Sequence, residues 1–290
     1  MKSLTAQVLR ATPDVLGEGP VWHDGAFWWI DIESRKLQRL HPDGDYRSWD
    51  TGERVGCAIP AADGSWILGL ENSLSQLHPA TGTISVLAPL NKPPGDHRFN
   101  DGKCDPRGRL LVGTMSLAAP PMTSSFYRYV GGQALTELFS GIGTSNGLAW
   151  SADGASLYYI DSKTGRIDVC DYDLETGTPS NRRPLVQAAP TGRPDGMCID
   201  AAGNLWSGHW GGWAVRCYHG RTGECLAEIP IPCANVTSCC FGGPDLAHLY
   251  ITTASKGLTP EEHQAQPGAG RVFIAEPGVT GQPVPLFQEG

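Results

Sequence analysis

The chain has 290 residues, of which 37 are Gly and 23 are Pro, whereas charged residues make up only 18%. Together Gly and Pro supply about one residue in five, which argues against a helical bundle because both interrupt long helices. Since 40% of the residues are hydrophobic and the net charge is only −8, the chain can bury a sizeable core, and intrinsic disorder is excluded as well.

The charge balance and the apolar runs limit the partners that the sequence predicts. Acidic residues outnumber basic ones by 30 to 22 and no basic stripe is present, so nucleic acid is not expected as a partner. Apolar runs such as 26–32 are too short to cross a bilayer, so no membrane partner is expected. Segment 1–14 lacks the apolar core of a signal peptide.

The cysteines indicate a reducing environment. The chain has nine, most of them in apolar stretches, and none forms a C-x-x-C pair of the kind found in zinc or thioredoxin-type sites. Reduced cysteines in such stretches behave as small hydrophobes. We therefore expect a cytoplasmic protein with free thiols, present as a monomer or small homo-oligomer.

Short segments rich in aromatic and β-branched residues recur along the chain, each directly after a turn signal such as Asp-Gly. The predicted strands are 26–30, 65–69, 109–113, 156–160, 204–207 and 248–252. The turns recur at steps of roughly 40 to 50 residues, the spacing of propeller blades. The sequence thus predicts an all-β fold, a six-bladed β-propeller with four-stranded antiparallel blades, as one domain over residues 1–290. The alternatives are a β-sandwich or two smaller β domains.

A polar residue followed by Gly stands just before the first predicted strand of several units. The four examples are Glu18-Gly19, Asp101-Gly102, Asn146-Gly147 and Asp195-Gly196. Because the first strand of each propeller blade lines the central channel, these oxygen donors are expected to form a ring around the axis. Crowded carboxylates repel one another unless a cation lies between them, and oxygen ligands suit a hard divalent ion. Each position taken alone could instead be an ordinary turn.

Several motifs, in chain order, carry a resemblance to a known family. They include Gly17-Glu18-Gly19-Pro20, Arg98-Phe99-Asn100-Asp101-Gly102, Gly113-Thr114-Met115, Ser145-Asn146-Gly147 and Pro194-Asp195-Gly196. With them the sequence resembles the gluconolactonase/regucalcin family, also called the senescence marker protein family. The resemblance covers nearly the whole chain and implies a six-bladed propeller of metal-dependent lactonases.

The resemblance also implies roles for individual residues. It assigns Glu18, Asn146 and Asp195 as ligands of one divalent metal ion, for which Ca²⁺, Zn²⁺, Mn²⁺, Mg²⁺ and Fe²⁺ all stay open. Asp195 is in addition the proposed general base, and Arg98 and Asn100 are expected to hold the hydroxyls or the ring oxygen of the substrate.

Other positions are left open by the resemblance or depart from it. Asp101 is expected either to order its loop or to hold a second ion. Where regucalcin-like members carry a Glu that reaches the substrate, this chain has Ala118 in an apolar loop, so its pocket differs from theirs. His209 and Trp210 are candidates for the pocket wall, with packing at a blade edge as the alternative.

These features predict a metal-dependent hydrolase that opens the ring of a sugar-acid lactone and releases the aldonic acid. The lactone is then the expected small-molecule partner. A first alternative is an organophosphate triester hydrolase, although Arg98 and Asn100 favour a hydroxylated substrate. The others are a non-catalytic calcium-binding regulatory propeller and a protein-binding scaffold.

Overall fold

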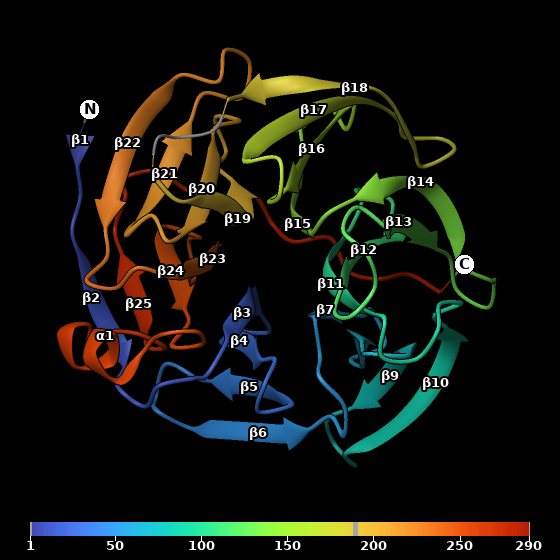
Figure 1. Ribbon diagram of the computed structural model, residues 1–290, viewed down its shortest axis with the longest axis horizontal. Coiled ribbons are helices and arrows are strands. Elements are labelled where there is room, and N and C mark those ends of the chain that lie inside the picture. The colour runs from blue at the N-terminus through green and yellow to red at the C-terminus, as the bar shows by residue number, and fades with distance from the viewer. Residues whose placement is uncertain (1, 188–190, 290) are drawn as a thin grey trace.

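The strands are arranged in a ring around a central channel (Figure 1). The structure, a computed structural model, describes residues 2–187 and 191–289. Within these residues the strands form six sheets, each with four antiparallel strands ordered from the channel outward, and one sheet carries a fifth strand in parallel. The protein is therefore a six-bladed β-propeller with four-stranded antiparallel blades, as the repeat of turns predicts.

The first three blades are continuous in sequence. Blade 1 contains β3 (Gly17–His23), β4 (Ala26–Asp31), β5 (Lys36–Leu40) and β6 (Tyr46–Asp50). Blade 2 contains β7 (Cys57–Pro60), β8 (Trp66–Gly69), β9 (Ser73–His78) and β10 (Thr83–Pro89). Blade 3 contains β11 (His97–Cys104), β12 (Leu110–Ser116), β13 (Ser124–Tyr129) and β14 (Thr136–Ile142).

Blade 4 is also continuous in sequence, whereas blades 5 and 6 each include a strand from the N-terminal segment. Blade 4 contains β15 (Ser145–Trp150), β16 (Ser156–Asp161), β17 (Arg166–Asp173) and β18 (Thr178–Val186). Blade 5 contains β19 (Arg193–Ile199), β20 (Leu205–Trp210), β21 (Ala214–Tyr218) and β22 (Cys225–Pro230), with β1 (Lys2–Ser3) added in parallel to β22. Blade 6 contains β23 (Val236–Gly242), β24 (His248–Thr253), β25 (Val272–Ala275) and β2 (Ala6–Arg10).

Blade 6 closes the ring because its outermost strand comes from the N-terminus. Strand β2 pairs antiparallel with β25, with Ala6 opposite Ala275 and Val8 opposite Phe273. A blade made from both ends of the chain ties the start of the ring to its end. The helix α1 (Pro260–Ala265) lies in the connection between β24 and β25, and among the described residues no helix is long and apolar enough to cross a bilayer.

The core lies between neighbouring blades. Inner and second strands are both deeply buried: every residue is buried in the inner strands β15 and β23 and in the second strands β4 and β8. Aromatic side chains from adjacent blades stack across these layers, as Phe27 of blade 1 does on Tyr250 of blade 6 with ring centroids 4.7 Å apart. The aromatic alternation seen in the sequence therefore reflects packing of blade on blade.

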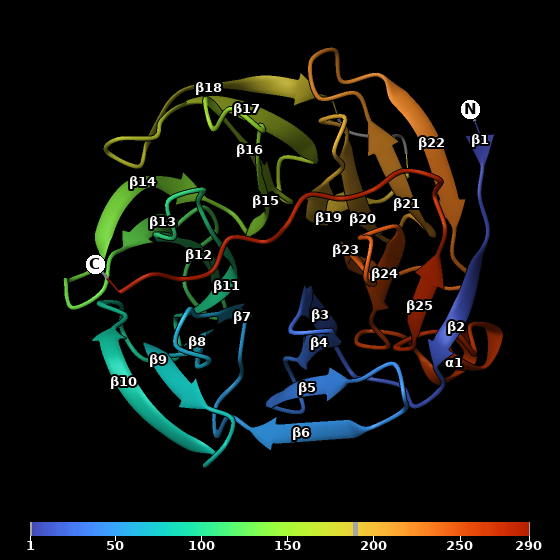
Figure 2. The same cartoon turned by 180° about the vertical axis from the view of Figure 1, so that it is seen from behind.

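The C-terminal segment crosses one end of the channel (Figure 2). After β25 the backbone N–H of Gly281 donates to the carbonyl oxygen of Leu246 in blade 6. Further along the chain, the N–H of Phe287 donates to the carbonyl oxygen of Pro60 in blade 2. The Gln288 N–H then donates to Gly108 in blade 3. This segment thus spans the ring and covers the end of the channel where the inner strands turn back into the second strands.

Candidate functional site

The inner strands are irregular at one shared level of the channel. Five of them carry a shift of register there: β3 after Glu18, β11 after Phe99, β15 after Asn146, β19 after Pro194 and β23 after Val236. A β-bulge leaves residues without a cross-strand partner and re-aims their side chains. The polar residues followed by Gly therefore lie inside the inner strands, at bulges, and the prediction that they precede these strands was wrong. Turn-forming dipeptides also suit bulges, which explains the error.

The close approach of blades 4 and 5 requires a glycine at position 147. A Cβ atom on Gly147 would lie 2.7 Å from the backbone oxygen of Asp195, a contact that backbone atoms cannot relieve. The absence of a side chain at Gly147 thus lets β15 and β19 approach at the level of Asn146 and Asp195.

A chain of hydrogen bonds joins blades 3, 4 and 5 at this level. Arg98 Nη1 donates to Asn100 Oδ1 at 2.6 Å, and Asn100 Nδ2 donates to Asn146 Oδ1 at 2.7 Å. Asn146 Nδ2 donates to Ser162 Oγ at 2.8 Å, and that hydroxyl donates to the Pro194 carbonyl at 2.6 Å. These bonds fix the orientation of the side-chain amides of Asn100 and Asn146. The Oδ1 atom of Asn146 keeps one lone pair for a further partner.

Three carboxylates share the same region. The pKa of Glu18 rises to about 8, first because burial disfavours the charged form and then because Asp101 lies nearby. Burial, together with repulsion from Glu18 and Asp101, raises the pKa of Asp195 well above its usual value. Burial raises the pKa of Asp101 as well, against the opposing charge of Lys103. The site thus gathers acidic groups whose charged form a bound cation would favour.

The donor set fits a hard divalent cation. Asn146 and Asp195 are buried at 6% exposure each, and Glu18 is half-buried. In the part of the chain that the structure describes, no three His, Cys, Asp or Glu side chains form a metal-binding group. Glu18, Asn146 and Asp195 offer two carboxylates and an amide oxygen, which are donors of the kind that Ca²⁺, Mg²⁺ and Mn²⁺ prefer.

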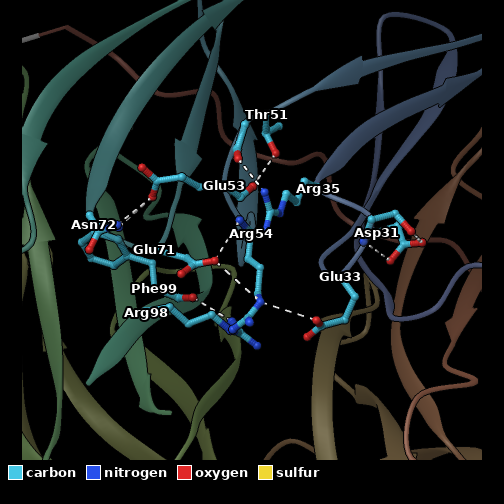
Figure 3. Close-up of polar contacts among 12 residues, drawn as sticks. Asp31, Glu33, Arg35, Thr51, Glu53, Arg54, Glu71, Asn72, Arg98 and Phe99 are labelled. Atoms are coloured by element: carbon cyan, nitrogen blue, oxygen red, sulfur yellow. Dashed lines mark hydrogen bonds and ion pairs between the residues drawn. The ribbon is translucent and has the colours of Figure 1, made fainter. Parts of the chain in front are cut away.

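Arg98 lies beneath a set of charged residues that the sequence analysis did not single out (Figure 3). Arg54 Nε lies 3.5 Å from Glu33 Oε2 and 3.6 Å from Glu71 Oε1, and Lys256 pairs with the other oxygen of Glu33. Burial lowers the pKa of Arg98 to about 10, while Glu33 and Glu18 oppose this shift. Arg98 therefore stays positively charged at neutral pH.

The charged rim, defined as Glu33, Arg54, Glu71 and Lys256, had a signal in the sequence. Glu33, Glu71 and Lys256 each follow the second strand of a blade by two or three residues. Equivalent positions of a repeat face the same end of a propeller. Comparing the repeats at this position, rather than only at the inner strands, would have placed these residues on one face.

His209 and Trp210 end β20 in different environments. His209 is fully buried, with Nε2 3.1 Å from the Tyr218 hydroxyl, and burial lowers its pKa to about 3, so the ring is neutral. Trp210 is partly exposed and packs against the apolar cluster that includes Leu16 and Ala254. Trp210 is thus the more accessible of the two side chains, whereas His209 is enclosed within the fold.

The loop that follows β12 carries Ala118. The backbone N–H groups of Leu117 and Ala118 both donate to the Asp96 carbonyl, at 2.8 and 3.3 Å. Leu117 and Met122 expose 38% and 45% of their surface. This face of the loop therefore offers apolar surface where a carboxylate was expected from the resemblance.

A cavity of about 640 Å³ occupies the channel on the other side of the carboxylates. Asp101 and Lys103 line it at one end and segment 281–285 at the other, with apolar residues such as Ile59, Leu148 and Phe241 between them. Neither Arg98 nor Asn146 lines this cavity. Of the candidate site residues, Asp101 is thus the one that lines this cavity.

Comparison with known proteins gives consistent results. Residues 16–255 match the family model described as "SMP-30/Gluconolactonase/LRE-like region". Regucalcin of Xenopus laevis is 35% identical over 97% of this chain and 97% of its own. A solved structure from Agrobacterium tumefaciens, titled a calcium-binding protein, regucalcin, is 30% identical with a TM-score of 0.93 and covers 99% of both chains. A gluconolactonase structure from Xanthomonas campestris has a TM-score of 0.75 at 21% identity, covering 93% of this chain and 89% of its own, and shows the shared fold.

The family match covers most of the chain and includes all six inner strands. The identity to the Xenopus protein extends over nearly the full length of both chains. Membership of this group supports a role as a lactonase-like or calcium-binding propeller. The chain belongs to the SMP-30/gluconolactonase/LRE-like family.

Proposed function

We propose that this protein is a divalent-metal-dependent hydrolase of sugar-acid lactones. Glu18, Asn146 and Asp195 hold the ion, and Arg98 and Asn100 hold the substrate. The observation that supports this most is the position of Glu18, Asp101 and Asp195 on the inner strands of three blades, where burial raises the pKa of all three carboxyl groups. Acidic groups withdrawn from water in this way are costly for the fold unless a ligand uses their charge.

Ring opening of a lactone needs a polarised carbonyl, an attacking water molecule and stabilisation of negative charge on the carbonyl oxygen. A divalent cation, when bound, polarises the carbonyl and stabilises that charge. Asp195 accepts the proton from the attacking water at a carboxylate oxygen, a step that contributes roughly 10²- to 10⁴-fold to the rate. The other residues act by binding and orientation.

Arg98 and Asn100 orient the hydroxylated ring. The hydrogen bonds of Arg98 to Phe99 and Asn100 both use Nη1, so the N–H groups on Nε and Nη2 can donate to the substrate. Arg98 is buried at 3% exposure and its position is fixed by Asn100. A donor held in place in this way positions the substrate at little entropic cost.

We infer that the apolar loop and the charged rim form the remaining surfaces around the substrate. Leu117 and Met122 present apolar surface, whereas Arg54 and Glu71 lie on the side of Arg98. We infer a small lactone whose hydroxyls face Arg98 and whose less polar edge faces the loop. The lack of a carboxylate at Ala118 argues for fewer hydroxyl contacts than regucalcin-like members make.

The test is a pH-indicator assay on a panel of five- and six-membered aldonolactones. The protein is first treated with a chelator, and Ca²⁺, Mg²⁺, Mn²⁺ or Zn²⁺ is then added back singly. We expect turnover of at least one lactone, loss of turnover after chelation and recovery with one of the metals. Turnover that ignores the chelator would contradict the metal requirement.

The same panel separates the alternatives. Hydrolysis of a phosphotriester with no reaction on any lactone would indicate an organophosphate hydrolase. Calcium binding without turnover of either class would indicate a calcium-binding propeller without catalysis. Glu18→Gln serves as the matched control in each arm, since it keeps the size of the side chain and removes its negative charge.

A further inference from the structure

Two cysteine side chains from adjacent blades lie in contact beside the channel. The Sγ atoms of Cys198 on β19 and Cys239 on β23 are 3.7 Å apart. In a disulfide this distance is about 2.05 Å, so a shift of less than 2 Å, shared by two side chains, would join them. The two residues are 41 positions apart and belong to blades 5 and 6.

The backbones approach closely next to this pair. A Cβ atom on Gly196 would lie 3.0 Å from the Ser238 Cα atom, so β19 and β23 are in backbone contact two residues before Cys198 and one before Cys239. Disulfides require Cα atoms within about 7 Å of each other. The close packing at Gly196 thus holds β19 and β23 together beside the two cysteines.

The environments of the two thiols differ in a way that suits a reactive and a resolving cysteine. Cys198 is partly exposed and lines the cavity of about 640 Å³, so a small oxidant in the channel can reach it. Cys239 is buried at 1% exposure, and burial raises the pKa of its thiol. Its Sγ also donates to the Trp206 carbonyl in blade 5, which holds it on the side of Cys198.

We propose that Cys198 and Cys239 form a reversible disulfide that locks blade 5 to blade 6 when the protein meets a hydroperoxide. The thiolate of Cys198 attacks one oxygen of hydrogen peroxide, so that an S–O bond forms and the O–O bond breaks. The hydroxide that leaves takes up the proton lost by Cys198 and becomes water. The two sulfur atoms together supply the two electrons that reduce the peroxide.

The second step consumes the sulfenic acid. Cys239 Sγ attacks Cys198 Sγ, the S–S bond forms, and the S–O bond breaks. The proton of Cys239 leaves with the hydroxyl group as a second water molecule. A dithiol reductant reverses the reaction by thiol–disulfide exchange and restores both thiols.

The neighbouring Cys240 provides a matched control. It packs with Phe27 and Tyr250 on the side of blade 1, away from the cluster around Cys239. It is also buried and adjacent in sequence, and within the described residues the Sγ–Sγ contact of Cys198 is with Cys239 rather than with Cys240. Cys240→Ser should therefore leave the disulfide intact, whereas Cys198→Ser should abolish it.

The experiment titrates thiols in the denatured protein before and after exposure of the folded, reduced chain to hydrogen peroxide. All nine cysteines are free in the structure. We expect two thiols to be lost and regained with dithiothreitol, and non-reducing peptide mapping to show the Cys198–Cys239 link. Because Cys239 and Cys240 share one tryptic peptide, between Arg221 and Lys256, the mapping is done in the Cys240→Ser variant as well.

Further outcomes decide against the proposal. Nine titratable thiols after peroxide, or a sulfenic acid at Cys198 that dimedone traps without any cross-link, would overturn it. A link that disappears in Cys240→Ser but persists in Cys239→Ser would show that Cys240, not Cys239, is the partner of Cys198. That result would also overturn the proposal. The wild-type titration needs no variant to fold, so the proposal is tested even if one substitution destabilises the propeller.

Discussion

Asn100 donates from Nδ2 to Asn146 Oδ1 across 2.7 Å, and so a residue of blade 3 fixes the amide orientation of a residue of blade 4. With this bond in place, the Oδ1 atom of Asn146 faces Asn100 and its NH₂ group faces Ser162. The Oδ1 of Asn100 in turn accepts from Arg98. The candidate substrate-binding residues and the candidate metal ligand are thus one connected unit.

Asn100→Leu is expected to weaken metal binding as well as substrate binding. The substitution keeps the side-chain size but removes the donor to Asn146 and the acceptor for Arg98. Loss of a residue that orients a ligand typically costs 10- to 100-fold in metal affinity or activity. Calorimetric titration with the metal measures the change in metal affinity. The change in substrate binding is measured as kcat/KM on the best lactone. Asn72→Ala, which removes an exposed amide bonded to Glu53, is the control and should change neither.

Metal binding at neutral pH is expected to release protons. The pKa of Glu18 lies at about 8 in the metal-free protein, so at pH 7 most molecules carry a proton there that a cation must displace. Calorimetric titration in two buffers of different ionisation enthalpy should therefore show proton release at pH 7 and stronger binding at pH 8.5. Affinity that is the same at both pH values, with no proton release, would contradict the assignment of Glu18 as a ligand.

The same carboxyl group should make the metal-free protein less stable as the pH rises. Its pKa is 4.5 in the unfolded chain and about 8 in the folded one, so the folded chain holds the proton more tightly. The stabilising contribution is complete below pH 4.5 and is lost as the pH rises through 8. Glu18→Gln should lack this part of the pH dependence. Thermal melts of both proteins in the presence of a chelator measure the difference.

Asp14 is a second buried acid and lies outside the site. Burial raises its pKa from 3.8 to about 6, against the hydrogen bonds from Gln38 and Trp29. Its stabilising contribution is present below pH 3.8 and is lost as the pH rises through 6. Relative to Asp14→Asn, the wild-type chain should lose up to about 3 kcal/mol over that interval. Denaturant unfolding of both proteins at pH 4, 5, 6 and 7 measures this, and a constant difference would contradict it.

The C-terminal segment is expected to contribute to the stability of the ring. Phe287 is buried at 2% exposure and stacks on Tyr129 of blade 3 with ring centroids 5.8 Å apart. Phe287→Ala should cost about 3–5 kcal/mol, the range for removing a buried aromatic side chain. Gln288→Ala, next to it and exposed, is the control. Equal unfolding midpoints for the two variants would show that the segment is only loosely attached.

The parts of the fold that repeat are the parts that the sequence predicted. The second strand of each blade alternates aromatic and β-branched residues after an Asp-Gly or similar turn, and β4, β8, β12, β16, β20 and β24 lie where those segments were placed. Local signals suffice here because each blade is a unit of consecutive hairpins.

The parts that depend on distant pairing were not predicted. Strand β2 has few buried residues, and nothing within Ala6–Arg10 indicates that it pairs with β25, more than 260 residues away. The C-terminal segment contains Pro283 and Pro285 and has no strand pattern, so its course across the channel follows only from tertiary contacts. The charged rim was missed because Arg54 and Glu71 resemble ordinary solvated loop residues until blades 1 and 2 bring them together.

The candidate site likewise has a part that the sequence predicted and a part that it did not. The repeated polar-Gly pattern predicts that Glu18, Asn146 and Asp195 lie near the axis, but it does not predict their positions inside the inner strands, next to register shifts. The bond between Asn100 and Asn146 joins residues 46 positions apart, and the sequence contains no sign of it. Spacing along one chain thus indicates which residues reach the axis but not which side chains orient one another.

The most direct test of the metal site measures bound metal and lactone turnover on the same samples. Wild-type protein and Asp195→Asn are freed of metal with a chelator, reloaded with the best metal of the panel, desalted and assayed. The wild type should bind about one ion at the site and regain its turnover, whereas Asp195→Asn should hold less metal and stay inactive at every metal concentration. Full metal content together with wild-type turnover in Asp195→Asn would contradict the proposed role of Asp195 as ligand and base.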